Sequence, residues 1–385
     1  MNFDLSDEQT ILRESVRVLC AREIAPRAAA WDREQRFPQE AIAPLAEMGL
    51  FGMHIPTAYG GSGLGMLEHA LVTEEVAAAD GSVGLTLASH TLLCAEHINR
   101  AGNEAQRRKY LPRLASGKAL GAWALTEPDS GSDAGAARCR AIRRDGVKWV
   151  LNGRKIFITQ GSVAETYVVL VSTTPEKKQK GLSAFILEKG MPGLQPGKPI
   201  AKMGLCASDT CDVILEDVVV SDEQRLGEID HGYSDALNIL DKGRIGIGAW
   251  SVGIGRAALT AACAYAKQRV QFGRPIAQFQ AIGNMIADMA TELDAARLLV
   301  WRAAWMQDHK QRTRRESSVA KYYAARAAVR ACDAAVQIHG GYGYTRDFPV
   351  ERYLRDVKLA EIGEGTNEVQ KMVIAREVLK GLVIS

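Results

Sequence analysis

Apolar positions at helical spacing dominate roughly the first 120 residues of the chain. Ser6 followed by Gln9 forms a capping-box pattern, and apolar residues then recur at helical spacing from 11 to 19. A second helix is predicted over 37–53, and two or three more are predicted between 67 and 116. This pattern predicts an N-terminal helical domain over residues 1–120.

Between residues 121 and 230 the apolar pattern changes to short runs rich in β-branched and aromatic residues. Asp145-Gly146 and Asn152-Gly153 each stand between two strand-like runs, which predicts a β-hairpin at both places. Three further runs continue the strand pattern, at 166–172, 182–188 and 211–220. We therefore predict a compact antiparallel β-barrel as the middle domain.

From residue 231 to 385 the pattern is helical again. Three long, alanine-rich segments span 236–269, 280–309 and 318–340, and a last helix is expected after Gly365. Four helices suit an antiparallel bundle, so we predict a C-terminal four-helix bundle. The fold class is mostly α with a central β domain, in three domains that 385 residues readily supply.

Composition narrows the possible partners. Hydrophobic residues make up 47% of the chain and charged residues 24%, which is typical of a globular protein. A formal net charge of +3 is too small to favour nucleic acid or an anionic membrane surface. The most basic stretch, 309–317, is predicted to be a solvated loop between helices rather than a binding arm.

The cysteines and the N-terminus set expectations about location. Seven cysteines are scattered without a C-x-x-C pair, which indicates neither a disulfide framework nor a metal site. The first residues lack the pattern of a secretory signal, and no apolar run reaches the length of a membrane span. We expect a cytoplasmic protein with no metal and no membrane partner.

Three segments carry candidate binding chemistry, each with an ordinary alternative. The polar, glycine-containing loop at 124–135 suits a polar or phosphorylated ligand, or is a turn-rich linker. Arg269 and Arg274 could hold a pyrophosphate, although two solvated cations on a turn are the simpler interpretation. Paired glycines at 340–341 could be a helix C-cap or could let backbone lie against a cofactor. None of these segments matches a dinucleotide-binding or P-loop motif, which excludes those classes.

Glu364 is the most unusual carboxylate in the chain. In the stretch LAEIGEGTNEVQ (359–370), it alone among three glutamates has glycine on both sides. Glycines bracket a charged residue where the backbone turns sharply or approaches another group closely. This arrangement makes Glu364 a candidate functional residue.

Six motifs together make the chain similar to the acyl-CoA dehydrogenase family over essentially its whole length. They are LTEPDSGSD, FIT, DKGRIGIG, RVQFGRP, QIHGGYGY and EGTNE, in the order and at the approximate spacing found in that family. The chain most resembles the short-chain and related bacterial enzymes. The resemblance implies an oxidoreductase that acts on CH–CH groups.

The resemblance also implies FAD as cofactor and assigns residues to it. One side of the flavin would be contacted by Trp123, Leu125, Thr126, Gly131, Ser132, Phe157, Ile158 and Thr159. A neighbouring subunit would supply Arg269, Phe272, Gln280, Gln337, Ile338, Gly340 and Gly341, so a homotetramer built as a dimer of dimers is expected. Thr366 and Glu368 would lie near the phosphates, at a helix start.

For catalysis, the resemblance implies that Glu364 is the base that removes the α-proton of an acyl-CoA thioester while hydride leaves for flavin N5. Its own N–H and a ribityl hydroxyl would stabilise the developing enolate oxygen. Acyl-CoA contacts are implied for Ser132, Asp241, Arg244, Gly363 and Gly365, with an electron-transferring flavoprotein as electron acceptor. Some relatives carry the base at the position of Gly243, which here has no side chain.

Three residues depart from the family pattern. Gly363 replaces a frequent tyrosine, which leads us to expect a branched or cyclic acyl group. Phe157 replaces a frequent tryptophan beside the flavin, and Cys206 stands where arginine is common, for which the sequence offers no reason. An acyl-CoA oxidase and a glutaryl-CoA-type dehydrogenase stay open as alternatives. A DNA-associated flavoprotein is disfavoured by the small net charge.

Overall fold

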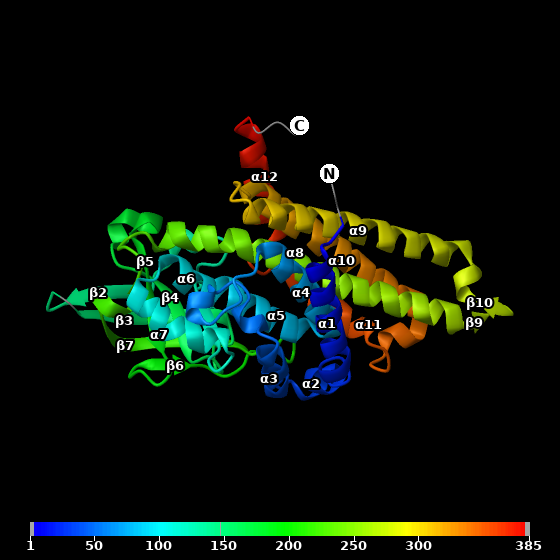
Figure 1. Ribbon diagram of the computed structural model, residues 1–385, viewed down its shortest axis with the longest axis horizontal. Helices are drawn as coiled ribbons and strands as arrows, with labels where there is room; N and C mark the ends of the chain where they lie inside the picture. The colour runs from blue at the N-terminus through cyan, green and yellow to red at the C-terminus, as the bar shows by residue number, and fades with distance from the viewer. Residues whose placement is uncertain (1–3, 147, 382–385) are drawn as a thin grey trace.

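The computed structural model describes residues 4–146 and 148–381. The N-terminal helices and the β-sheet lie beside each other, and long helices run past both (Figure 1). The N-terminal helices are α1 (Asp7–Glu23), α2 (Ala28–Glu34), α3 (Gln39–Glu47), α4 (Met66–Ala79), α5 (Gly81–Ser89), α6 (Glu96–Ala101) and α7 (Glu104–Ala115).

The N-terminal predictions are confirmed at the helix start and corrected in detail. Ser6 caps α1 with the expected capping box, since its side chain accepts from the N–H of Gln9. The second predicted helix is shorter than 37–53, because Gly49 adopts a φ of 75° and ends α3. α2 was not predicted. A π-helical segment, His90–Ala95, joins α5 to α6.

The middle region is one sheet with strand order β6-β7-β3-β2-β4-β5-β8, with β1 beside β4. Its pairings are antiparallel, except that β4 runs parallel to β1 and to β2. The strands are β1 (Gly121–Ala124), β2 (Arg140–Arg144), β3 (Lys148–Thr159), β4 (Thr166–Ser172), β5 (Leu182–Glu188), β6 (Leu194–Pro196), β7 (Thr210–Ser221) and β8 (Arg225–Leu226). β4 and β5 coincide with two of the predicted runs.

Only one of the two predicted hairpins exists. Asp145 and Gly146, with φ of 50° and 76°, turn the chain between β2 and β3. The hairpin at Asn152-Gly153 is wrong, because both residues lie inside β3, where a shift of register against β7 marks a bulge. Gly153 has a φ of 142°, and a Cβ there would overlap Cys139. The glycine is therefore required by a close approach within the sheet.

The C-terminal helices are α8 (Gly232–Gln268), α9 (Gln280–Asp308), α10 (Arg314–His339), α11 (Val350–Val357) and α12 (Asn367–Leu379). α8 packs against α4, α9 and α10. By length and composition α8 could span a membrane, but 61% of its apolar window is buried inside the protein. At the far end, β9 (Val270–Gln271) and β10 (Arg274–Pro275) form a small hairpin between α8 and α9.

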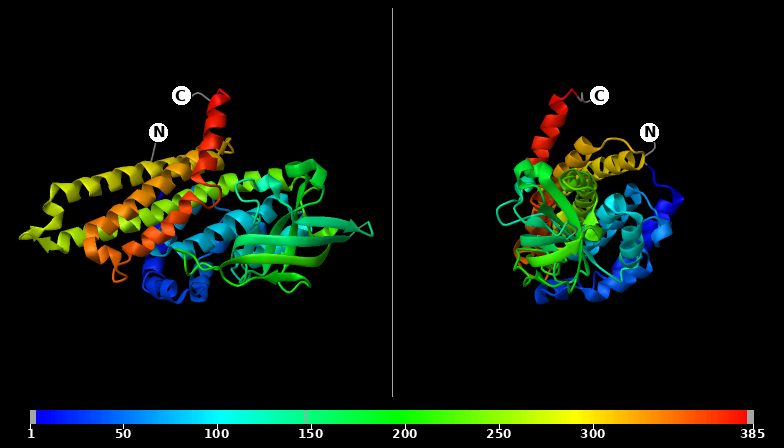
Figure 2. Two further views of the ribbon diagram at one scale, coloured as in Figure 1. Left: turned by 180° about the vertical axis from the view of Figure 1, so that it is seen from behind. Right: turned by 90° about the vertical axis from the view of Figure 1, so that its left-hand side faces the viewer.

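Two further helices pack against the three long helices of the C-terminal region. The short α11, which was not predicted, lies against α8 and α10. The helix after Gly365 is α12, which contacts α10 and then rises away from the body (Figure 2). Nor is 309–317 simply a solvated loop: α10 begins at Arg314, and Arg312 pairs with the buried Glu377 of α12 at 2.6 Å.

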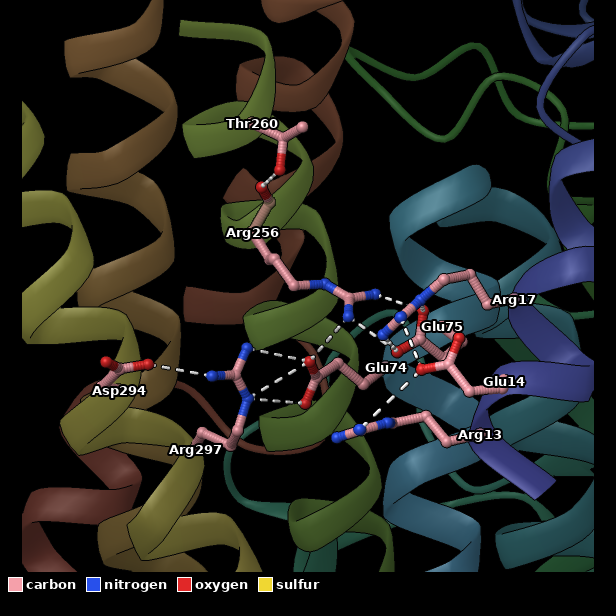
Figure 3. A network of polar contacts seen from close by, with 9 residues as sticks. All are labelled: Arg13, Glu14, Arg17, Glu74, Glu75, Arg256, Thr260, Asp294 and Arg297. Carbon is pink, nitrogen blue, oxygen red and sulfur yellow. Dashed lines mark hydrogen bonds and ion pairs between the residues drawn. The ribbon is translucent and has the colours of Figure 1, made fainter. Parts of the chain in front are cut away.

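A network of buried charges fixes the N-terminal helices on the bundle (Figure 3). Glu75 of α4 binds Arg17 of α1 at 2.9 Å and Arg256 of α8 at 2.6 Å. Its neighbour Glu74 binds Arg297 of α9 at 3.0 Å. Because each buried carboxylate meets arginines from other helices, the network favours one relative placement of four helices.

Cys206 lies at a junction of the three regions. Arg355 of α11 donates to its Sγ at 3.7 Å and to the carboxylate of Asp32, in α2, at 2.8 Å. Arg355 therefore supplies a guanidinium beside position 206, and an arginine at that position would place two cations together.

Candidate active site

Glu364 sits in a strained turn between the 3₁₀ segment Lys358–Glu361 and α12. Its φ is 52°, in the left-handed region, and that of Gly365 is 90°. The Glu364 N–H donates to no acceptor within the described residues. The side chain points at α8, where a Cβ at Gly243 would overlap Oε2 and lie 3.1 Å from Cδ. The absent side chain at Gly243 therefore makes room for this carboxyl.

The carboxyl of Glu364 has the properties of a general base. Its Oε2 is buried and has no hydrogen-bond partner within the described part of the chain. Burial raises the pKa of Glu364 to about 7, while Lys321 and then Arg244 act to lower it. A carboxyl that titrates near neutral pH, with unoccupied lone pairs, can accept a proton from a bound molecule.

Two buried side chains hold the backbone of this turn. Lys321 of α10 donates from Nζ to the carbonyl of Gly365 at 2.8 Å and to Oδ1 of Asn367 at 3.4 Å. Gln370 of α12 donates to the carbonyls of Glu364 and Gly365, at 3.3 and 2.9 Å. Sequence reasoning missed both residues. The sequence feature that could have revealed Lys321 is its place among the serines and alanines that α10 buries.

Asp241 and Arg244, which the resemblance assigned to acyl-CoA, form an internal pair beside Glu364. Arg244 Nη1 donates to Asp241 Oδ1 at 2.8 Å and to Ser318 Oγ at 3.4 Å. Its Nε is buried and has no partner in the described chain. Arg314 approaches the other oxygen of Asp241 at 3.6 Å. Arg244 thus contributes a buried positive charge on the α8 side of the site.

The residues assigned to one side of the flavin lie around β1, the loop that follows it and the end of β3. The Ile156 N–H donates to the Thr126 carbonyl at 2.9 Å, which brings that loop against β3. The buried Lys155 donates to the Leu125 carbonyl at 2.9 Å. The side chains of Leu125 and Ile158 are in the core, so only their backbone could contact a ligand.

This surface fits a flat, polar cofactor such as FAD. Phe157 is held at a φ of 59° with its ring 61% exposed, an arrangement that suits stacking on another flat ring. A Cβ at Gly131 would meet nothing within 4 Å. The hydroxyls of Thr126, Ser132 and Thr159 have no hydrogen-bond partner within the described residues. Hydroxyl donors, open backbone and an exposed aromatic ring are the groups that a flavin needs.

The second group of assigned cofactor residues lies at the far end of the bundle. Arg269 and Gly340 border a cavity of about 510 Å³, together with Tyr265, Gln271, Ile276, Ile338, His339, Gly341, Tyr342 and Thr345. A Cβ at Gly340 or Gly341 would meet nothing within 4 Å. Beside this cavity are the exposed Phe272 and the start of α9 at Gln280, and Gln337 lies in the last turn of α10.

Within one chain the assigned cofactor residues therefore form separate groups. The cavity lies at the end of the molecule opposite the β-sheet (Figure 1). Thr366 and Glu368 lie at the start of α12, where the Thr366 hydroxyl accepts from the Val369 N–H at 3.3 Å.

Comparison with known proteins defines the class. The chain matches the N-terminal, middle and C-terminal domains of acyl-CoA dehydrogenases over residues 6–118, 122–218 and 230–379. It is 46% identical over 381 residues to a probable acyl-CoA dehydrogenase, YngJ, of Bacillus subtilis (strain 168), covering 99% of this chain and 100% of that protein.

Two further relatives bear on function. The caffeyl-CoA reductase-Etf complex subunit CarC of Acetobacterium woodii is 42% identical over 376 residues, covering 97% of this chain and 99% of that protein. The solved butyryl-CoA dehydrogenase of Megasphaera elsdenii matches with a TM-score of 0.96 at 41% identity, covering 98% and 100% of the two chains.

The chain therefore belongs to the acyl-CoA dehydrogenase family and has its three-domain fold. It is an oxidoreductase, and its cofactor is FAD.

Proposed function

We propose that the protein oxidises an acyl-CoA thioester to the 2-enoyl-CoA, with Glu364 as the base that removes the α-proton. One observation carries this proposal: a buried carboxyl in a strained turn, with a pKa of about 7 and an Oε2 that no described residue hydrogen-bonds. Such a group costs stability and contributes nothing to folding, which is typical of a catalytic residue.

The chain's own groups account for the proton transfer. Glu364 accepts the α-proton on Oε2, and its unpartnered N–H is free to donate to the thioester oxygen as negative charge develops there. Gly365 allows the turn that presents both groups from one residue. When bound, FAD supplies the hydride acceptor for the β-carbon. An electron-transferring flavoprotein then accepts the electrons, as the name of the CarC relative suggests for its own complex.

The FAD site is completed by a second copy of the chain. Support comes from the cavity at Gly340, which lies at the end of the bundle away from the β-sheet, whereas Phe157 belongs to strand β3 of that sheet (Figure 1). We infer that one bound FAD takes the two groups from different chains. A homotetramer, a dimer of dimers in the cytoplasm, satisfies this requirement, and sedimentation equilibrium measures its mass.

A short branched or cyclic acyl group is the proposed substrate. Gly363 has an ordinary φ, and a Cβ there would lie 3.4 Å or more from its nearest neighbour, Leu359. The backbone therefore does not require glycine at this position. Its missing side chain leaves space directly beside Glu364, where the α- and β-carbons must bind.

Anaerobic bleaching of the flavin absorbance by a panel of acyl-CoA thioesters tests the proposal. The panel holds butyryl, isobutyryl, isovaleryl, 2-methylbutyryl, glutaryl and cyclohexanecarbonyl thioesters. Glu364→Gln should abolish bleaching, whereas the matched control Glu292→Gln, whose carboxylate pairs with Arg330 at 2.8 Å, should retain it.

Each outcome has a distinct meaning. Bleaching by butyryl-CoA alone would refute the branched or cyclic substrate, and bleaching by glutaryl-CoA would favour the glutaryl-type alternative. Rapid peroxide formation in air would identify an oxidase. A flavoprotein that no thioester bleaches would refute the dehydrogenase activity itself.

A further inference from the structure

Lys321 is a cation in the interior of the protein, at the middle of the bundle. It is 0% exposed, and its Nζ donates to the carbonyl of Gly365 and to Oδ1 of Asn367. No carboxylate of the described residues lies within ion-pair distance of this nitrogen. Burying an ammonium without an ion-pair partner lowers the stability of the folded state. We therefore expect the contacts of Lys321 to serve function rather than stability.

The contacts of Lys321 hold the segment that carries Glu364. The Gly365 carbonyl directly follows Glu364, and Asn367 is the first residue of α12. Glu364 is a non-glycine residue at a φ of 52°, and such a conformation persists only where surrounding groups fix it. Lys321 fixes this turn from α10, and Gln370 fixes it from α12.

The charge of Lys321 also acts on the carboxyl of Glu364 and favours its ionised form. The cations around that carboxyl are Lys321 from α10 and Arg244 from α8. Arg244 is already paired with Asp241 at 2.8 Å. The other charged groups acting on Lys321 are Glu361 and Glu368, on either side of the turn. Among the described residues, Lys321 is therefore a cation near Glu364 that no ion pair neutralises.

We infer that Lys321 is a positioning residue for Glu364, which holds its left-handed turn through the Gly365 carbonyl and provides the unpaired positive charge that favours its ionised form. The inference rests on the proposed role of Glu364 as base. Lys321 itself neither gains nor loses a proton in the reaction.

The test measures the ionisation of Glu364 directly as well as the reaction. Infrared spectroscopy follows the protonated carboxyl against pH in the purified holoenzyme, with the band assigned by its loss in Glu364→Gln. The kcat/KM of the substrate found above is measured over the same pH range. Lys321→Met removes the charge and the donor, and Lys321→Gln removes the charge and keeps an N–H donor. Lys202→Met is the matched control, because Lys202 also donates to two backbone carbonyls, those of Ile200 and Ser208.

In the wild type, Glu364 should titrate with a pKa of about 7. In both Lys321 variants the midpoint should rise by about one unit or more, and kcat/KM at pH 7 should fall about fivefold or more and recover at higher pH. The Lys202 variant should keep the wild-type midpoint and profile.

Two results separate this inference from the proposed function. An unchanged Glu364 midpoint in the Lys321 variants overturns the inference, even if their activity falls equally at every pH. Lys321→Gln decides the question if Lys321→Met does not fold. If the Glu364 midpoint shifts but no acyl-CoA thioester reduces the flavin, the role of Lys321 is supported and the proposed reaction is refuted.

Discussion

Gly243→Ala tests whether the missing side chain at position 243 of α8 leaves the room that the Glu364 carboxyl needs. The added Cβ would overlap Glu364 Oε2 and lie 3.1 Å from Cδ and 3.2 Å from Leu93 Cδ2. Non-bonded carbons rest about 3.5–4.0 Å apart, so Cδ must withdraw by roughly 0.4–0.9 Å, and the overlapping Oε2 must withdraw further. A displacement of about 1 Å at a reacting group costs on the order of 100-fold in rate. We expect flavin bleaching to slow by about 10- to 100-fold.

The stability of this variant should change far less than its activity. Alanine gains about 1 kcal/mol over glycine inside a helix, and overpacking costs about 1–3 kcal/mol. The free energy of unfolding in urea should therefore fall by about 0–2 kcal/mol. Gly255→Ala is the control on the same helix, since its Cβ would crowd Leu293 Cδ2 at 2.5 Å, away from Glu364. Wild-type bleaching by Gly243→Ala would refute the reasoning.

Three further predictions concern pH, buried charge and the sheet. Burial raises the folded pKa of Glu364 from 4.5 to about 7, so between these pH values the folded state holds a proton that the unfolded state loses. The free energy of unfolding should therefore fall as pH rises from 4.5 to 7. Thermal unfolding of Glu364→Gln, followed against pH, should lack this part of the pH dependence. Arg256→Met leaves the buried Glu75 with fewer partners, so the free energy of unfolding measured in urea should fall by about 3 kcal/mol. A loss below about 1 kcal/mol would mean that the network contributes little to stability. Gly153→Ala should destabilise by about 1–3 kcal/mol through its clash with Cys139, and a neutral calorimetric result would contradict the close approach seen in the sheet.

Errors in the sequence-based predictions came from features that depend on distant partners. Asn152-Gly153 has the local preference of a hairpin, but pairing of β3 with β7 on its other side turns the same dipeptide into a bulge. The short α11 has few residues with which to show a period, and its place against α8 and α10 decides its structure.

Glu364 illustrates how far sequence reasoning reaches within the candidate site. The glycines at 363 and 365 marked it as a residue in a special turn, and the turn is present, with φ of 52° at Glu364. Its pKa could not be read from the sequence, because burial by other elements raises it and Lys321 opposes the rise. Sequence reasoning noted that Gly243 lacks a side chain, but not that Glu364 fills that space.

The sequence by itself determined the features that a few neighbouring residues control. The cap of α1, the turn at Asp145-Gly146, strands β4 and β5 and the glycine-bracketed Glu364 all depend on local backbone preferences and side-chain periodicity. Tertiary structure alone decided that Lys321 acts on Glu364 and that the cavity lined by Arg269 and Gly340 lies at the end of the bundle away from the β-sheet. Electrostatics and packing act through space, so they depend on which helices meet, and no local pattern specifies that.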